Sequence, residues 1–269
     1  MATTIPIHEG RIFRAGPSLP ALRRISPRDI GHALRAGYED FMAWPSHAAF
    51  LVVIYPIVGL LLAYATAQQN VIALFYPLLA GFAILGPFAA LGLYEVSRRR
   101  ELGEEPSWRD ALSVMRRTNV SSMLFLGAVL LAIFVCWLAA AQTIYALTLG
   151  TAPDSFADLL HRSLYTRPGW ALIILGNGVG FLFAALAFTI SVISVPLMLE
   201  RRLGAGDAIR CSVQAVRHNP GPMALWGLIV AGGLAVGSAP LLIGLTVVLP
   251  ILGHATWHLY RRVVVEETK

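Results

Sequence analysis

The chain has 269 residues, of which 57% are hydrophobic and only 13% are charged; its formal net charge is +6 and its mean hydropathy is +0.66. Soluble globular proteins carry about 25% charged residues, so this composition excludes a soluble enzyme, a disordered chain and an ordinary nucleic-acid-binding protein. The class that remains is an integral membrane protein.

The N-terminal residues 1–25 have the composition of a flexible tail. They hold three prolines before Ala21 and charges of both signs. Arg23 and Arg24 are not followed by a short apolar stretch with a cleavage site, so a signal peptide is not predicted. We therefore expect a tail over 1–25, a single membrane domain over 26–262, and a second short tail over 263–269.

Apolar runs of about 20 residues, the length that crosses a bilayer, follow one another along the rest of the chain. They cover residues 48–67, 71–96, 123–149, 170–199 and 222–260. The last run is too long for one helix, and Ser238-Ala239-Pro240 provides the small residues and the breaker for a tight hairpin. The sequence thus predicts an all-α membrane protein with six transmembrane helices, with five as the alternative.

The basic residues lie mainly on one side of these spans. Nineteen of the 21 arginines and lysines flank the spans on that side, and only Arg162 and Arg167 lie on the other. Arginine and lysine mark cytoplasmic loops, so both termini of this multi-pass protein are predicted to be cytoplasmic. Six spans keep Arg261 and Arg262 on the same side, whereas five would not. Basic flanks suit anionic lipid headgroups, and no nucleic-acid partner is needed.

A helix-start pattern occurs before several of the spans. Ser26-Pro27-Arg28-Asp29 and Ser107-Trp108-Arg109-Asp110 each place a serine cap three residues before an acid, and Gly206-Asp207 opens a weaker version. Each start leads into an amphipathic segment, which predicts helices lying on the cytoplasmic face of the membrane. The pattern is consistent with a threefold repeat of one such helix and a two-span hairpin. Alternatively, connectors beside a bilayer become amphipathic without any repeat.

Three polar residues of the spans are candidates for a cavity or a transport path. Glu95 and Glu200 end the second and fourth spans, and each is followed by arginines. They form either ion pairs at the headgroup level or the mouth of a cavity. Asn177 lies within Gly176–Gly180, a spacing that lets helices pack closely; its alternative role is a substrate contact.

His254 and His258 are four residues apart and therefore share one face of the last span. They are candidate haem ligands; alternatively, they belong to an interfacial belt with Trp257 and Tyr260. Asp158 and His161 offer too few ligands for a metal site, and the chain has no phosphate-binding loop, zinc spacing or nucleophile motif. The sequence therefore predicts no catalytic site, no metal and no cofactor, with haem as the alternative.

Three sequence stretches resemble a known family. They are GFAILGPFAALGLYEVSRR at residues 81–99, SVPLMLER at 194–201, and a third between Ala215 and Gly227 that contains Asn219-Pro220-Gly221-Pro222-Met223. All three are similar to signatures of a bacterial family of predicted integral membrane proteins of unknown function. Its members are often labelled as similar to cytochrome c oxidase subunit I. This label implies that the protein associates with a respiratory complex. The resemblance to a bacterial family implies a place in the bacterial inner membrane, and we accordingly expect a structural or accessory component of a membrane complex there rather than an enzyme. The alternatives are a small-solute or lipid transporter or channel, and a haem-binding redox protein.

Overall fold

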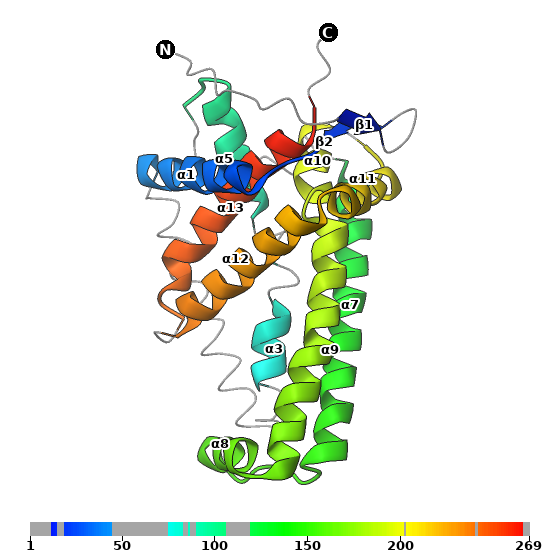
Figure 1. The fold of residues 1–269 in the computed structure, drawn as a ribbon, viewed down its shortest axis with the longest axis vertical. Helices are drawn as coiled ribbons and strands as arrows, with labels where there is room; N and C mark the ends of the chain where they lie inside the picture. Colours follow the sequence, from blue (N-terminus) through cyan, green and yellow to red (C-terminus); the bar gives the residue numbers. More distant parts are fainter. Residues whose placement is uncertain are drawn as a thin grey trace.

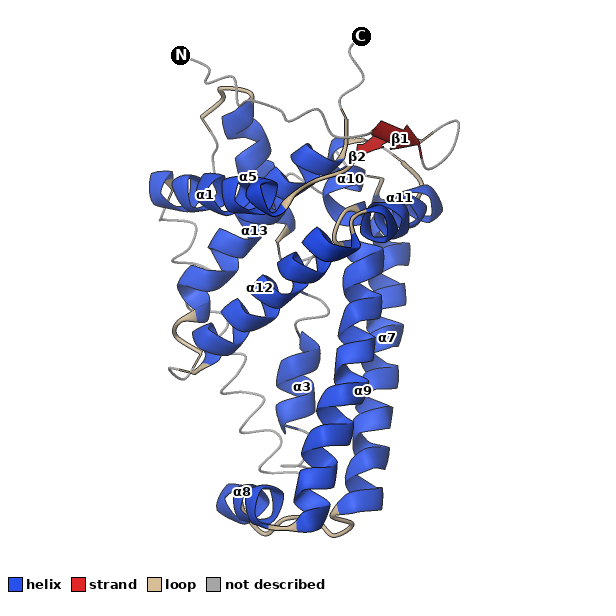
Figure 2. Cartoon of the chain, in the orientation of Figure 1, coloured by secondary structure: helices blue, strands red, loops and turns tan. Residues whose placement is uncertain are grey.

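The computed structural model describes the chain in segments that are almost entirely helical (Figures 1 and 2). The described residues are 12–14, 19–44, 75–82, 86, 90–105, 119–201, 203–239 and 242–265. The predicted first span at 48–67 and the second helix start at Ser107–Asp110 lie outside these residues.

A long helical hairpin forms one side of the molecule (Figure 1). It consists of α7 (Val120–Thr148) and α9 (Arg167–Ser191), connected at the far end through the short helix α8 (Phe156–Tyr165). At about 1.5 Å per residue, the 29 residues of α7 are long enough to cross a bilayer from one headgroup layer to the other. The hairpin confirms that the predicted third and fourth runs form long apolar helices.

The fourth run does not form one continuous helix, contrary to the prediction for 170–199. α9 ends at Ser191, and α10 (Ser194–Glu200) begins after a short turn. The N–H of Ile193 donates to the hydroxyl of Ser212 (3.2 Å), and that hydroxyl donates to the carbonyl of Thr189 (2.7 Å). These two backbone groups would bond each other in an unbroken helix, so the inserted side chain accounts for the break.

Ser212 comes from α11 (Ala205–His218) and is fully buried. Replacing it with alanine should leave the Ile193 N–H and the Thr189 carbonyl unpaired, at a cost of about 2 kcal/mol of unfolding free energy. Hydrogen exchange at the Ile193 amide should become faster. Ser121→Ala, which removes an exposed hydroxyl bonded to Asn119, is the control and should change neither quantity. Unchanged exchange at Ile193 would contradict the bridging role of the hydroxyl.

The final apolar run divides into two helices, as predicted at Ser238–Pro240. They are α12 (Pro220–Ser238) and α13 (Leu245–Val263). A Cβ added at Gly233 would lie 3.2 Å from a Val248 side-chain atom, and one at Gly237 would lie 2.9 Å from Leu245. The two glycines therefore allow α12 and α13 to approach closely.

Three helical segments of the described chain are long and apolar enough to cross a membrane: α7, the combined α9 and α10, and α12. The described parts of the second predicted span include the helices α3 (Phe75–Phe82) and α5 (Leu91–Glu101). The sixth corresponds to α13, which has many buried residues. Six spans, and both termini in the cytoplasm, therefore stay predictions.

The amphipathic helix α1 (Pro27–Ala43) begins where the sequence predicted. The backbone N–H of Ser26 donates to Asp29 Oδ2 (2.8 Å), and the two side chains complete a capping box. The α1 and α11 helices lie at the same end of the molecule (Figure 1), as expected for the first and third amphipathic segments. The threefold repeat itself stays a prediction.

Within the segments predicted as tails, the described residues 12–14, 21–23 and 264 form β-structure, while the division into tails and one membrane domain stays a prediction. Strands β1 (Ile12–Arg14) and β2 (Ala21–Arg23) pair antiparallel, and Leu22 forms a β-bridge with Val264. Leu22 is fully buried and Val264 is nearly so. Such short apolar segments are held by tertiary packing, which their local composition does not reveal.

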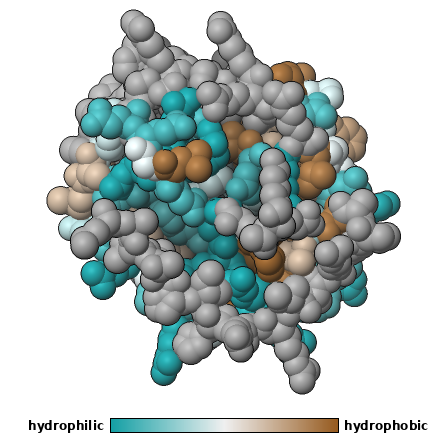
Figure 3. Space-filling view, turned by 90° about the horizontal axis from the view of Figure 1, so that it is seen from above, coloured by the Kyte–Doolittle hydropathy of each residue, from teal (hydrophilic) through white to brown (hydrophobic). Residues whose placement is uncertain are grey.

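The end of the molecule that carries α1, α11 and the two strands is its polar end. The ends of α5, α10 and α13 also reach it (Figure 1). Seen from above, hydrophilic residues cover much of the described part of this face, with smaller hydrophobic patches among them (Figure 3). This end brings together most of the charged side chains discussed below.

Candidate functional site

A close approach between α1 and α13 determines where the polar residues of these helices meet. A Cβ added at Gly37 would lie only 2.5 Å from the backbone nitrogen of Ala255. Glycine is therefore required for the two helix backbones to come this near. Asp40 follows Gly37 by nearly one helical turn. It therefore lies in contact with α13 and with the neighbouring α5.

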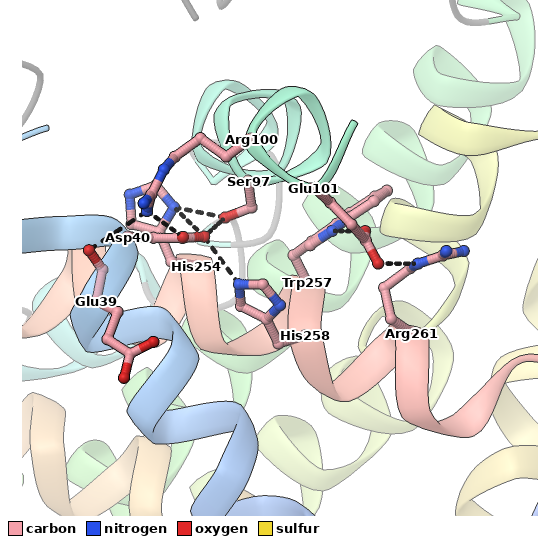
Figure 4. Close-up of polar contacts among 9 residues, drawn as sticks. All are labelled: Glu39, Asp40, Ser97, Arg100, Glu101, His254, Trp257, His258 and Arg261. Atoms are coloured by element: carbon pink, nitrogen blue, oxygen red, sulfur yellow. Dashed lines mark hydrogen bonds and ion pairs between the residues drawn. The ribbon is translucent and has the colours of Figure 1, made fainter. Parts of the chain in front are cut away.

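Asp40 lies at the centre of a buried cluster, which we call the Asp40 cluster: Asp40, Ser97, Arg100, His254 and His258 (Figure 4). Oδ2 of Asp40 accepts hydrogen bonds from Ser97 Oγ (2.5 Å) and His258 Nε2 (2.8 Å). Oδ1 accepts from the guanidinium of Arg100. The carboxylate side chain is only 8% exposed, so donors from two other helices replace the water that it loses on burial.

Ser97 connects Asp40 to His254. The hydroxyl has a single proton, which it donates to Asp40, while Nδ1 of His254 lies 2.8 Å from the same oxygen. His254 Nδ1 must therefore carry a proton and donate it to Ser97. This hydrogen-bond pattern assigns the protonation of the His254 ring, which is 2% exposed.

The charge state of Asp40 follows from these partners. Burial raises the pKa of the carboxyl, but hydrogen bonds from His258 and Ser97 and the nearby charges of His258 and His254 outweigh it and hold the pKa below its usual value. Asp40 is thus a carboxylate at neutral pH. Its ionised form stabilises the fold, and that stabilisation disappears only in acid.

The chemistry open to the Asp40 cluster is limited by burial and pairing. Ser97 is fully buried, and its hydroxyl is bonded to Asp40 and to His254, so it is not open to a substrate in the way that an exposed nucleophile is. Among the residues that the structure describes, no group of three or more His, Cys, Asp or Glu side chains is placed to hold a metal ion. The arrangement joins α1, α5 and α13 through one shared carboxylate.

A second set of contacts continues along α13 beyond His258 (Figure 4). Glu101, the last residue of α5, accepts hydrogen bonds from Trp257 Nε1 (3.2 Å) and from Arg261 Nε (3.0 Å). Arg261 also donates to Glu200 Oε1 (2.8 Å), and the hydroxyl of Tyr260 donates to the same carboxylate. Polar side chains of α13 thus link α5 to α10.

Glu95 and Glu200 are both held in ion pairs at the polar end. Glu95 is fully buried and accepts from Arg98 (2.8 and 2.9 Å) and from Arg99 (2.9 Å). Glu200 is held by α13, as described above. The pairing of Glu95 with its own arginines matches the ion-pair alternative, although the buried position differs from an exposed rim.

Asn177 lies apart from the two glutamates. Its Oδ1 accepts from the hydroxyl of Tyr76 in α3 (2.9 Å), and its Nδ2 donates to the carbonyl of Ile173 (2.8 Å). Fourteen residues, or roughly 20 Å of helix, separate Asn177 from the end of α9. The structure therefore does not bring Glu95, Asn177 and Glu200 together around one site.

The spacing of Gly176 and Gly180 predicted that both glycines allow a neighbouring helix to pack closely, but only one of them does so. A Cβ added at Gly180 would lie 2.9 Å from the ring of Trp137 in α7, whereas one at Gly176 would meet nothing within 4 Å. Only the second glycine thus supports close packing between α7 and α9.

Asp40, Ser97 and Arg100 were not recognised from the sequence as site residues. The α1 helix exposes 51% of the aromatic residue Tyr38, whereas it buries Gly37 and Asp40. The signal was present in the spacing of Ile30, Ala33, Gly37 and Asp40, which repeats every three or four residues. An acid in that series could have indicated a buried partner.

The long apolar helices and the internally paired charges define a helical integral membrane protein. Residues 75–200 match the model of a family described as "Predicted integral membrane protein (DUF2189)". This match covers just under half of the chain and confirms the resemblance to a membrane protein family of unknown function that residues 81–99 and 194–201 indicated. No curated protein and no solved structure matches the chain.

Proposed function

We propose that this protein is a structural or accessory component of a larger complex in the bacterial inner membrane, without catalytic activity and without a cofactor. The observation that carries the proposal is the Asp40 cluster, in which buried polar groups are used to hold three helices together. The transport alternative predicts Glu95, Asn177 and Glu200 around one polar cavity, but each of them is bound by separate neighbours. The basic end would face the cytoplasm and the anionic headgroups of that leaflet.

The two histidines support a structural role rather than haem ligation. His258 uses Nε2 to donate to Asp40, and His254 uses Nδ1 to donate to Ser97. Haem ligation through Nε2 of His258 would require its bond to Asp40 to break, whereas ligation through Nε2 of His254 would leave the bond to Ser97 in place. Their position within the helix contacts favours the interpretation that they stabilise the docking of α1.

One surface available to a partner lies on the α7–α9 hairpin. Among the described residues, large hydrophobic side chains are exposed along both helices. They are Leu124, Phe125, Leu131 and Val135 of α7, and Ile174, Leu175, Phe181 and Leu182 of α9. An apolar surface of this kind faces either lipid or the helices of another membrane protein.

Photo-crosslinking in native membranes tests the accessory role. A photoreactive amino acid at Leu131, which is 50% exposed, or at Leu182, which is 65% exposed, should yield a discrete adduct with one partner protein. The matched control is Leu130, which is fully buried and should yield no intermolecular adduct. The resemblance of residues 81–99 makes a respiratory complex the first partner to look for by mass spectrometry.

Absence of any protein adduct at the two exposed positions, together with purification of the protein alone in mild detergent, would contradict the accessory role. The same preparation should be colourless. A haem absorption band that disappears in a His254→Ala, His258→Ala variant would replace the proposal with a redox function.

A further inference from the structure

Most arginines at the polar end are neutralised by carboxylates of the same chain. Each arginine of α5 and both arginines of α13 form ion pairs, several of them partly buried. The pairs are Arg98 and Arg99 with Glu95, Arg100 with Asp40, Arg261 with Glu101 and Glu200, and Arg262 with Asp29. These side chains are therefore not the ones that would attract an external anion.

Three other arginines of this end are exposed and have no carboxylate partner within the described part of the chain: Arg24, Arg28 and Arg217. They lie around a single contact, in which the N–H of Ile25 donates to Asn219 Oδ1 (2.8 Å). Arg24 adjoins Ile25, Arg28 follows three residues later, and Arg217 lies two residues before Asn219. We call this region, Arg24, Arg28 and Arg217 around Asn219, the basic corner.

The acceptors and the carboxylate near the basic corner are already bonded within the protein, so they add little negative charge that would repel an anion. Asn219 donates through Nδ2 to the carbonyls of Ala215 (3.0 Å) and Arg23 (3.3 Å), so these acceptors are occupied. Asp29, a carboxylate close to Arg28 in the chain, is held by Ser26 and Arg262. The helices α1 and α12 both begin here, at Pro27 and Pro220, and helix N-termini favour negative charge.

The basic corner lies where a membrane helix begins. α12 starts at Pro220, immediately after Asn219, and is long and apolar enough to cross a membrane. Leu225 and Leu228 follow on its surface and are 37% and 67% exposed. A cationic region at the end of a span, with exposed leucines one to two turns further into the bilayer, matches the two parts of a phospholipid.

We propose that the basic corner binds an anionic phospholipid, whose phosphate pairs with Arg24, Arg28 and Arg217 and whose acyl chains lie along Leu225 and Leu228. This inference rests on the membrane placement within the proposed function but not on the accessory role. The ligand gains charge pairing at one end and apolar contact at the other. A neutral lipid would gain only the second.

Native mass spectrometry of the full-length protein, reconstituted in a mixture of phosphatidylcholine and phosphatidylglycerol, tests the proposal. The wild type should retain phosphatidylglycerol preferentially, and the triple variant Arg24→Gln, Arg28→Gln, Arg217→Gln should lose this preference. Each arginine near a membrane surface contributes roughly fivefold to binding. The expected loss for all three is therefore on the order of 100-fold.

A matched control removes the same charge elsewhere. Arg35 and Arg210 are exposed but pair with Glu39 and Asp207, and Arg167 is exposed at the other end of the molecule. The variant Arg35→Gln, Arg167→Gln, Arg210→Gln should retain phosphatidylglycerol as the wild type does. Equal loss in both variants would overturn the proposal by showing a general charge effect, and retention by the first variant would overturn it directly.

The outcome is separable from the test of the accessory role. A protein that forms no crosslinks yet selects phosphatidylglycerol through these arginines would contradict the accessory role and support the lipid site. A crosslinked partner without lipid selection would do the opposite. Displacement of the lipid by inorganic phosphate alone would assign the basic corner to a soluble anion and overturn the lipid proposal.

Discussion

Replacing Asp40 with asparagine should destabilise the protein by about 3 kcal/mol, as measured by unfolding in mixed detergent micelles. Removal of one charge from a buried ionic cluster costs about 3–5 kcal/mol, because its partners remain desolvated. The lower end of this range applies because the Arg100 side chain is 31% exposed and can be partly hydrated. Asparagine keeps the shape of the side chain but offers an N–H to His258 where the carboxylate offered an acceptor.

The neighbouring residue provides the control. Glu39→Gln removes a carboxylate that is 59% exposed and pairs with Arg35, which is 80% exposed, so the unfolding free energy should change by less than about 0.5 kcal/mol. A comparable loss in both variants would show that net charge, and not the Asp40 cluster, is responsible.

Acid should abolish the difference between the wild type and Asp40→Asn. The folded-state pKa of Asp40 lies below its usual value because burial, which raises it, is outweighed by His258 and Ser97. The ionic contribution is therefore fully present above the unfolded pKa of about 4 and is lost as the pH falls through the lower folded pKa. A difference that remained constant from pH 7 to the acid limit would contradict the assignment of charge to Asp40.

Gly37→Ala should destabilise the protein by about 2–3 kcal/mol, the upper part of the range for overpacking. The new methyl group would lie 2.5 Å from the backbone nitrogen of Ala255 and 2.7 Å from its Cα. Backbone atoms cannot rotate away, so α1 must shift from α13. The shift would pull Asp40 from His258, and the effects of Gly37→Ala and Asp40→Asn should therefore be less than additive in the double variant.

The same helix offers a control of opposite sign. Gly31 is exposed, and a Cβ added there would meet nothing within 4 Å. Gly31→Ala should therefore stabilise the protein by about 0.5–1 kcal/mol through helix propensity alone. Thermal unfolding followed by circular dichroism compares the two variants, and destabilisation by Gly31→Ala would contradict the predicted dependence on the α13 contact.

Helix positions in this protein were largely predictable, because bilayer thickness and hydrophobic runs act locally along the chain. The α7 helix, the split between α12 and α13, and the capping box of Ser26 all follow from such signals. The break between α9 and α10 was not predictable, since it depends on Ser212, which comes from another helix about 20 residues later. Nothing local to Ile193 marks it.

The candidate site was predicted in part. His254 and His258 were expected on one face of the last helix, and both indeed contact the same cluster. Their partners could not be inferred, because Asp40 and His258 are 218 positions apart and no local pattern connects them. The positions of Glu95 and Glu200 were clear from charge, but the pairing of Glu200 with Tyr260 and Arg261 also required the tertiary fold.

The contact between α1 and α13 has a consequence for the order in which the chain assembles during synthesis. More than 200 residues separate the two helices, so at about 5–20 residues per second a ribosome needs on the order of 10–40 s between them. During this interval α1 has no α13 to pack against, so Asp40 is not buried and does not contact His254 and His258. Completion of α13 is thus the step that closes the fold, and a chain stopped before it would present α1 to the quality-control proteases of the cell.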